Sequence, residues 1–360
     1  IGESAHYCGE PGILFRDRFE ADNPTPQMRY LSTAPCAEVA MAANEVCQFS
    51  YINLTDIIKI QGEKPMVDFA KLQRTAQVLT RLLDAATQIT IENDLLGREK
   101  IAAKRRIGVG VTGFAALLMN LSIPYDSPEA KTLAEQISGS IDFATKRESV
   151  DLAKSRGAFP LFSESRFTDP SWVRRKMERT TGIIDGRRWQ ELFDDISVFG
   201  IRNATTTAFP PTGTSSRIVN TTTSFEPALQ LTYSAAEKNS NVTYNQIYDF
   251  VEKAMLASLG SDFERVLSLI VQNGGAVPDI LLNRVGRVFA IARQISYEAH
   301  MNIQAAFLLF ADESGAKTIN LPQATTLEEM RSIIHNAYEL GLKGLTVFRE
   351  NALEERTIVL

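Results

Sequence analysis

The sequence predicts an α/β fold, on two observations. The chain has 360 residues, 44% of them hydrophobic and 22% charged, which is an ordinary globular composition, and its length suits one large domain or two of usual size. Along the chain, long stretches with helical periodicity alternate with short β-prone runs. That alternation is typical of strands packed against helices.

The helical stretches give a clearer signal in the sequence than the β-prone runs do. Apolar residues recur at helical spacing from Phe69 to Asn93, which predicts a long helix. The run Ser127-Pro128-Glu129 combines an N-cap residue, a first-turn proline and a first-turn acid, so a second helix is expected from there to Gly157. Further helices are expected over Thr243 to Leu259, Pro278 to Phe310 and Thr326 to Leu340, the last with Gly341 as its C-cap.

Four short strands are expected between the helices. The β-prone runs are Gly12 to Phe15, Ala204 to Phe209, Lys317 to Leu321 and Gly344 to Phe348. By contrast, residues 163–189 are polar and rich in Arg and Asp, and we expect an irregular surface excursion there. We find no internal repeat and no low-complexity tract.

Charge and composition exclude several classes of function. The 38 Lys and Arg residues against 43 Asp and Glu give a formal charge of −5, so the sequence has no basic excess to attract a nucleic acid. No apolar run approaches the roughly 18 residues of a membrane span. The N-terminus has neither the basic start nor the apolar run of a signal peptide, so we expect a cytoplasmic protein with no membrane partner.

Cysteine and histidine usage argues against a metal centre. The chain has three cysteines, Cys8, Cys36 and Cys47, which are too few for a secreted disulfide framework in a chain of this size. It has only three histidines and no Cys-x-x-Cys or His-Glu-x-x-His spacing, so we predict no protein-ligated metal. We interpret Cys8 as a structural or incidental thiol.

A glycine-rich run matches a dinucleotide-binding pattern without its context. Residues Gly108 to Gly113 satisfy G-x-G-x-x-G, which requires a preceding buried strand and an acidic residue about 20 positions later. Residues 103–107 are too charged for such a strand, and the region near position 133 offers only Glu135 inside a helix. We therefore expect these glycines to serve close packing at a helix entry. A nicotinamide dehydrogenase stays open as an alternative, which failure to bind NAD would exclude.

Two thiols and a carboxylate form the first candidate site. In an extended segment, side chains two residues apart lie on the same side, so Cys36 and Glu38 could face one substrate. Cys47 follows eleven residues later, which leaves room for a turn between two extended segments. Two thiols approaching one site would indicate redox chemistry. An isolated cysteine is more often a small buried hydrophobe, and that interpretation stays open.

A loop rich in hydroxyl groups forms the second candidate site. The β-prone run that starts at Asn203 breaks at Pro210-Pro211 and opens into Thr212-Gly213-Thr214-Ser215-Ser216. The backbone N–H groups and hydroxyls of such a loop could hold a phosphate ester without a lysine. A plain turn is the alternative.

Taken together and in order, these segments resemble the ribonucleotide reductase large-subunit family, most closely its class II branch, which depends on adenosylcobalamin. The resemblance extends over nearly the whole chain. The matching runs are Gly9-Glu10-Pro11-Gly12, Asp22-Asn23-Pro24, Pro35-Cys36-Ala37-Glu38, Val46-Cys47, Ile52-Asn53-Leu54, Ile107-Gly108-Val109-Gly110, Pro211-Thr212-Gly213-Thr214, Glu226-Pro227, Gln304-Ala305-Ala306-Phe307, Lys317-Thr318-Ile319-Asn320 and Leu340-Gly341-Leu342-Lys343-Gly344.

The resemblance implies that residues 1–360 form the C-terminal portion of a ten-stranded α/β barrel with a central finger loop. The finger loop would span about residues 30–55, the phosphate-binding loop about 203–227 and the last barrel strand about 344–348. The activity implied is thiyl-radical reduction of ribonucleoside di- or triphosphates to 2′-deoxyribonucleotides.

The resemblance also implies roles for individual residues. Cys36 matches the thiyl radical that abstracts the 3′-hydrogen, Glu38 the carboxylate that takes the 3′-hydroxyl proton, and Cys47 one of two redox cysteines. Ala34 stands where the family usually has a substrate-binding Asn. The substrate-phosphate loop matches Pro211, Thr212, Gly213, Thr214 and Ser215, with Ser216 as a further candidate.

Within this resemblance, the class of reductase is inferred from motifs that the sequence lacks. Class I proteins carry two adjacent tyrosines where this chain has Thr346 and Val347, and the C-terminal residues contain no glycyl-radical motif of class III. Adenosylcobalamin is therefore the expected cofactor, with a dithiol of the thioredoxin type as reductant. A class I large subunit and a non-catalytic nucleotide-binding remnant stay open.

The resemblance covers only the C-terminal half of the family's barrel. Half a barrel would leave sheet edges and a core face uncovered, so we expect a separate N-terminal reductase chain as partner. That chain would carry the partner of Cys47. The assembled enzyme could form a homodimer.

Overall fold

The computed structural model describes residues 1–93, 97–178, 182–236, 243–282, 284–350 and 352. The strands are β1 Ile13–Leu14, β2 Ser32–Thr33, β3 Ala40–Met41, β4 Gln48–Asn53, β5 Ile58–Gln61, β6 Lys64–Val67, β7 Ile107–Thr112, β8 Thr232–Ala236, β9 Thr243–Ile247, β10 Thr318–Leu321 and β11 Gly344–Arg349.

The helices are α1 Gly2–Cys8, α2 Arg16–Asp22, α3 Phe69–Asn93, α4 Arg98–Lys104, α5 Phe114–Asn120, α6 Pro128–Arg156, α7 Pro170–Met177, α8 Gly186–Phe199, α9 Gly213–Ile218, α10 Asp249–Leu259, α11 Phe263–Gln272, α12 Arg284–Val288, α13 Tyr297–Leu308 and α14 Leu327–Glu339. Short 3-10 turns occupy Leu54–Ile57, Phe162–Glu164, Arg166–Thr168, Gly260–Asp262, Asp279–Leu281 and Ala292–Gln294.

Parallel strands lie at the centre of the fold, as an α/β architecture requires. β4 and β7 form a parallel pair, and single parallel bridges continue it from Val109 to Thr207 and from Phe209 to Gly315. β10 and β11 form a second parallel pair, which β1 joins in the antiparallel sense. The strand expected over residues 204–209 is present only as these bridges, although its backbone hydrogen-bonds to Ile107 and Val109 on one side and to residues 313–316 on the other.

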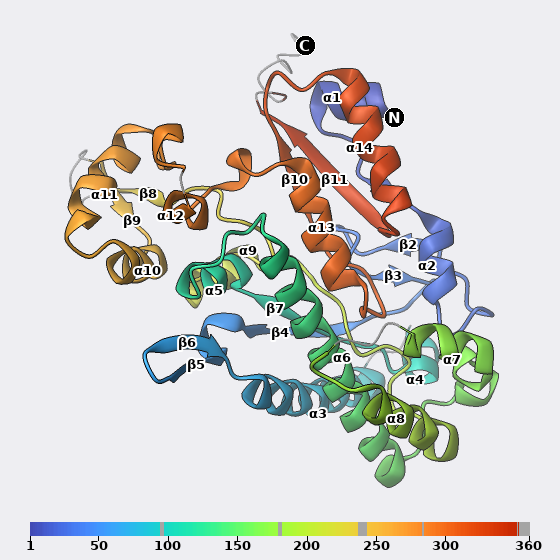
Figure 1. Ribbon diagram of the computed structural model, residues 1–360. Coiled ribbons are helices and arrows are strands. Elements are labelled where there is room, and N and C mark those ends of the chain that lie inside the picture. The colour runs from blue at the N-terminus through green and yellow to red at the C-terminus, as the bar shows by residue number, and fades with distance from the viewer. Residues whose placement is uncertain (94–96, 179–181, 237–242, 283, 351, 353–360) are drawn as a thin grey trace.

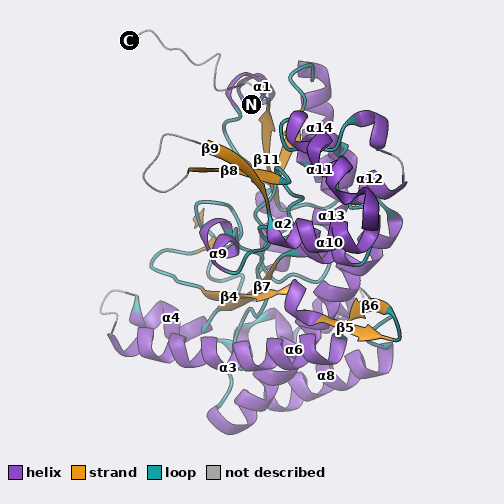
Figure 2. Ribbon diagram, turned by 90° about the vertical axis from the view of Figure 1, so that its left-hand side faces the viewer, coloured by secondary structure: helices purple, strands orange, loops and turns teal. Residues whose placement is uncertain are grey.

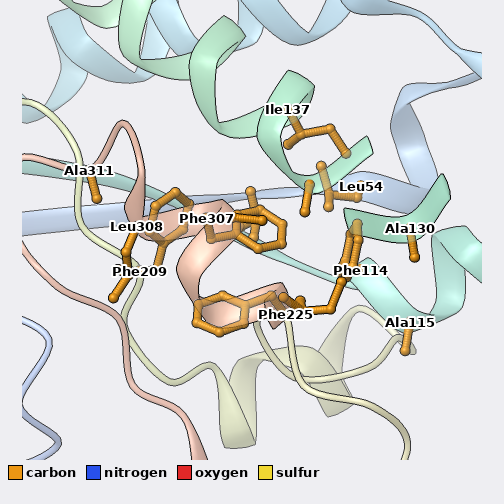
Figure 3. Packing of buried hydrophobic residues seen from close by; sticks show 14 of the residues in the cluster. Leu54, Phe114, Ala115, Ala130, Ile137, Phe209, Phe225, Phe307, Leu308 and Ala311 are labelled. Carbon is orange, nitrogen blue, oxygen red and sulfur yellow. The ribbon is translucent and has the colours of Figure 1, made fainter. Parts of the chain in front are cut away.

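Helices α3 and α6 lie along one side of the β4–β7 pair (Figure 1). Both were predicted, and α6 begins as expected, because the Ser127 hydroxyl accepts a hydrogen bond from the Ala130 amide. The main core lies between the helices and strands, where the aromatic rings of Phe114, Phe209, Phe225 and Phe307 pack against one another (Figure 3). Figure 2 shows the same helices lying under the β4–β7 pair.

Two of the expected helices are only partly correct. Residues 243–247 form β9, which pairs with β8 in an antiparallel hairpin, so the helix expected there begins only at Asp249. The helix expected over 278–310 is broken into short turns, α12 and α13. The last begins at Tyr297, because the Ser296 hydroxyl caps it by accepting from the Ala299 amide. In the first case, pairing with β8 in the hairpin overrode local helical spacing.

The expected irregular excursion at residues 163–189 is wrong. It contains α7 and the start of α8, whose N-caps are Asp169 and Asp185. Three aromatic residues in this polar stretch, Phe167, Trp172 and Trp189, are buried in a separate hydrophobic cluster. A few well-spaced rings were therefore enough to order a stretch whose average composition is polar.

The remaining predicted elements are confirmed near the chain ends. β1, β10, α14 and β11 lie within one or two residues of their expected limits. Gly341 follows α14 with a left-handed φ of 77°, which glycine adopts without strain. No helix among the described residues is both long and apolar enough to cross a membrane.

The glycine run from Gly108 to Gly113 lies elsewhere than expected. Gly108 and Gly110 are inside the buried strand β7, and only Gly113 stands at a helix entry, with a φ of 84°. A Cβ on Gly110 would lie 2.5 Å from the Ala208 carbonyl oxygen, so the expected close packing is real. α4 ends at Lys104, and Arg105 and Arg106 join it to β7, which agrees with the expectation that the charged residues here would not form a buried strand.

Candidate active site at a hairpin tip

A short hairpin presents Cys36. β2 and β3 pair antiparallel, with Thr33 opposite Ala40, and the Ala34 amide donates 2.8 Å to the Val39 carbonyl across the turn. Cys36 is exposed at the tip of this turn. The extended segment that we expected around Cys36 is therefore a tight turn, and Ala37 inside it has a left-handed φ of 63°.

Glu38 lies on the returning side of the turn and is buried, with 4% of its surface exposed. Its Oε2 atom has no hydrogen-bond partner among the described residues, while its backbone carbonyl accepts from the Ser314 amide at 2.9 Å. Burial raises the pKa of this carboxyl group above its usual range. Burial, and then the charge of Glu38, raise the pKa of the Cys36 thiol, so the carboxylate lies close enough for its charge to act on the thiol although the turn is not extended.

Cys47 lies just before β4, close to the hairpin that carries Cys36 and Glu38. Burial raises its pKa to about 12, which keeps the thiol protonated at neutral pH. The parallel register pairs Gln48 with Ile107, so Cys47 and Arg106 are neighbours at the start of the two strands. The Arg106 guanidinium acts against burial and lowers the Cys47 pKa.

A buried ion cluster of Glu45, Lys104, Arg106 and Glu313 connects these pieces. Arg106 pairs with Glu45 at 3.0 Å and with Glu313, and Lys104 pairs with Glu45 at 2.6 Å. The Glu313 carboxylate also accepts from the backbone amide of Ala40 in β3, at 3.3 Å. One cluster thus ties the hairpin that carries Cys36 to the start of β4.

This cluster was not predicted from the sequence. Its charges come from three segments that lie far apart in the chain, and no local spacing relates them. The only available signal was the placement of Lys104 and Arg106 directly before a strand with no charged residue, since buried cations need buried partners. Burial, with the positive charge of Arg106 adding to it, lowers the pKa of Lys104 to about 8.

The hydroxyl-rich loop folds into the start of α9. Pro211, Gly213 and Thr214 are exposed there, and nothing lies within 4 Å of a Cβ built on Gly213. Thr212 is buried, and its hydroxyl accepts from the Ser224 amide at 2.7 Å. Ser215 is half-buried and its hydroxyl lies 2.5 Å from the Tyr51 hydroxyl.

The remaining candidate residues make hydrogen bonds within their own turns and helices. Ser216 is buried and its hydroxyl donates to the Gly213 carbonyl at 3.0 Å, inside α9. Ala34 contributes backbone hydrogen bonds to the turn below Cys36. Cys8 ends α1, where its thiol donates to the Ser4 carbonyl at 3.2 Å. Within the described residues, no group of three or more His, Cys, Asp or Glu side chains could hold a metal ion.

The fold agrees with a comparison against protein families. The profile described as "Ribonucleotide reductase, barrel domain" matches residues 1–348. The chain belongs to that family, as the sequence motifs predicted.

Relatives and a solved structure agree with this assignment. The chain is similar to the "Vitamin B12-dependent ribonucleoside-diphosphate reductase" of Mycobacterium tuberculosis, at 32% identity over 99% of the chain and 47% of that relative. The enzyme of the same name from Thermoplasma acidophilum is 29% identical over 98% of the chain and 42% of that relative. The chain thus spans about half the length of the curated relatives that it matches.

The "Actinobacillus ureae class Id ribonucleotide reductase alpha subunit" has a similar structure. The TM-score is 0.74 at 22% sequence identity, over 98% of the chain and 61% of that subunit. At this identity the likeness shows the fold alone, and it supports the predicted reductase barrel.

Proposed function

We propose that this chain is the C-terminal part of the catalytic barrel of an adenosylcobalamin-dependent ribonucleotide reductase. The observation that carries the proposal is the exposed Cys36 thiol at a hairpin tip, beside a buried Glu38 carboxylate whose Oε2 has no described hydrogen-bond partner. The relatives are named as reductases of ribonucleoside diphosphates or of ribonucleotides. The reaction that the family resemblance implies is reduction of a ribonucleoside diphosphate or triphosphate to its 2′-deoxy form.

The protonation states suit this chemistry. A hydrogen-atom donor must keep its S–H bond, and the raised pKa values of Cys36 and Cys47 keep both thiols protonated at neutral pH. The raised pKa of the Glu38 carboxyl makes it a stronger base toward the 3′-hydroxyl proton of a ribose. Its Oε2, which has no hydrogen-bond partner among the described residues, is the atom that would accept that proton.

The reaction balances with two thiols. One ribonucleotide and two thiols give one deoxyribonucleotide, one water and one disulfide. Cys47 would supply one thiol, and a cysteine of the N-terminal half of the barrel would supply the other. A thioredoxin-type dithiol would then reduce the disulfide, since exchange through a mixed disulfide regenerates the thiols.

The exposure of Cys36 is compatible with an external radical source. When bound, adenosylcobalamin supplies a carbon-centred radical by homolysis of its cobalt–carbon bond. The hairpin tip leaves the Cys36 thiol accessible for hydrogen-atom transfer, while the buried ion cluster holds the base of the hairpin. We assign no corrin-binding residues to this chain.

The test is formation of deoxynucleotides by the chain together with a separate N-terminal reductase chain, adenosylcobalamin and a dithiol. Wild-type protein should give product, Cys36→Ala should give none, and the matched variant Cys8→Ala should keep full activity. Product formed by Cys36→Ala would refute the proposal. Product that depends on a metal-containing radical subunit and not on cobalamin would identify a class I large subunit instead.

Ala34 favours a second candidate, a non-catalytic nucleotide-binding protein, because this position has no side-chain amide to hold the substrate. That protein would bind ribonucleotides equally well with Cys36→Ala and would form no product with any radical source. The nicotinamide dehydrogenase alternative is set aside, because the family is a different one and Ala208 packs against the glycines of β7.

A further inference from the structure

Strand β4 has two distinct faces. The Gln48 side chain donates to the Thr90 hydroxyl of α3 at 2.9 Å, so the even-numbered positions face the helix layer. Because side chains alternate along a strand, Cys47, Phe49 and Tyr51 lie on the opposite face. Phe49 is 43% exposed there, which shows that this face is open.

The open face of β4 runs from the reducing thiol to the phosphate-loop candidate. At about 3.3 Å per residue, the four residues from Cys47 to Tyr51 span about 13 Å. At the far end, the Tyr51 hydroxyl lies 2.5 Å from the Ser215 hydroxyl. Figure 1 and Figure 2 both place α9, which carries Ser215, close to the β4–β7 pair.

Glycine packing explains why the loop reaches Tyr51. The register places Tyr51 opposite Gly110 of β7. A Cβ on Gly110 would lie 2.5 Å from the Ala208 carbonyl and 3.0 Å from Pro210, so only glycine lets that segment lie against the strand. The same segment continues directly into the loop that ends at Ser215.

We infer that Tyr51 is a positioning residue of the substrate-phosphate site, acting through Ser215. In this arrangement the Tyr51 phenol donates its proton to the Ser215 oxygen. The serine proton is then free to point toward a phosphate oxygen of the substrate. The inference rests on the proposed function, since it assigns to that site a residue that the resemblance does not.

The chemistry favours the phenol as the donor. A hydroxyl group has one proton and two lone pairs, so Ser215 can accept from Tyr51 and still donate to a ligand. A phenol is the stronger acid of the two hydroxyl groups, which makes it the better donor. The expected ligand is the diphosphate or triphosphate of a ribonucleotide, whose oxygens accept such bonds strongly.

The test compares Tyr51→Phe, Ser215→Ala and the double variant. A neutral hydrogen bond of this kind corresponds to about a 2- to 12-fold change in affinity. We therefore expect Tyr51→Phe to weaken binding of a ribonucleoside diphosphate by about that factor, measured by calorimetry on the chain assembled with its N-terminal partner. In the Ser215→Ala background, the same substitution should change the affinity by less than about twofold.

Two controls separate positioning from general damage. Tyr338→Phe removes a phenol that donates to the exposed Asp17 at 2.7 Å, and it should leave the affinity unchanged. In the active assembled enzyme, Tyr51→Phe should raise KM by the same factor as the dissociation constant and leave kcat within about twofold. The melting temperature should not move.

Several results would overturn the inference. One is a wild-type assembly of the two chains that binds no ribonucleoside diphosphate, and another is a Tyr51→Phe assembly that binds as the wild type does. Equal losses in the wild-type and Ser215→Ala backgrounds would show that Tyr51 does not act through the serine. If the binding pattern holds but no deoxynucleotide forms, the proposed function fails and the assignment of Tyr51 stands.

Discussion

Replacing Glu313 by Gln tests whether the buried ion cluster holds the hairpin of the candidate site. The cluster has two acids and two bases, and the side chains of all four are 1% exposed. Glu313→Gln leaves one uncompensated positive charge among them. Removing one partner of a buried ion pair costs about 3–5 kcal/mol of unfolding free energy, because the remaining charge stays buried.

The pH dependence of this cost can be worked out from Lys104. Its folded pKa is about 8 against an ordinary value of 10.5, so above pH 8 the folded protein releases a proton that the unfolded chain keeps. In Glu313→Gln the lost carboxylate lowers that pKa further. The cost should therefore be smaller at pH 9 than at pH 7, by about 1 kcal/mol if the Lys104 pKa falls by one unit and by no more than about 1.4 kcal/mol if it falls further.

Urea unfolding at pH 7 and pH 9 measures both effects. The matched control is Glu191→Gln, which removes an exposed partner of Arg187 on α8 and should unfold as the wild type does. The Cys36 thiol should also react faster with iodoacetamide in Glu313→Gln, because Ala40 loses a charged hydrogen-bond acceptor. A cost below about 1 kcal/mol at pH 7 would refute our account of the cluster.

Three further predictions concern groups buried near the strands. Burial lowers the pKa of His300 to about 3, so its contribution to stability is present above pH 6.5 and is lost as the pH falls toward 3; unfolding of His300→Gln should depend less on pH in that window. Gly110→Ala should cost about 1–3 kcal/mol in urea unfolding, because the new Cβ meets the Ala208 carbonyl, whereas Gly186→Ala has open space and should not. Cys47, with a pKa of about 12, should resist iodoacetamide at pH 8 until urea unfolds the chain, as peptide mass spectrometry can show.

The elements that could be predicted from the sequence carry their signals locally. Ser127 and Pro128 start α6, and Thr326 with Glu329 forms a capping box at the start of α14. Such signals act within one helical turn, so one sequence suffices to find them. Residues 243–247 show the limit of such local signals. Their helical spacing continues into α10, but their pairing with β8 overrides it.

The candidate site divides in the same way. Cys36, Glu38 and Cys47 could be predicted as candidate site residues because they lie within twelve residues of one another and form ordered motifs. The ion pair of Arg106 with Glu313 joins residues 207 positions apart, and the contact between Tyr51 and Ser215 spans 164 positions. Only the packing of strands brings such pairs together, so no local pattern could predict them.

The register of β4 with β7 sets the chemical state of Cys47 as well as its position. Pairing Gln48 with Ile107 places a guanidinium beside the thiol, and a lone cation there would favour the thiolate. The thiol nevertheless keeps a pKa of about 12, because burial opposes ionisation and the carboxylates of Glu313 and Glu45 offset Arg106. A thiolate has no hydrogen atom to give. The buried ion cluster therefore does two things for the proposed reaction. It holds the hairpin that carries Cys36, and its carboxylates offset the charge of Arg106, so that burial keeps the Cys47 thiol protonated.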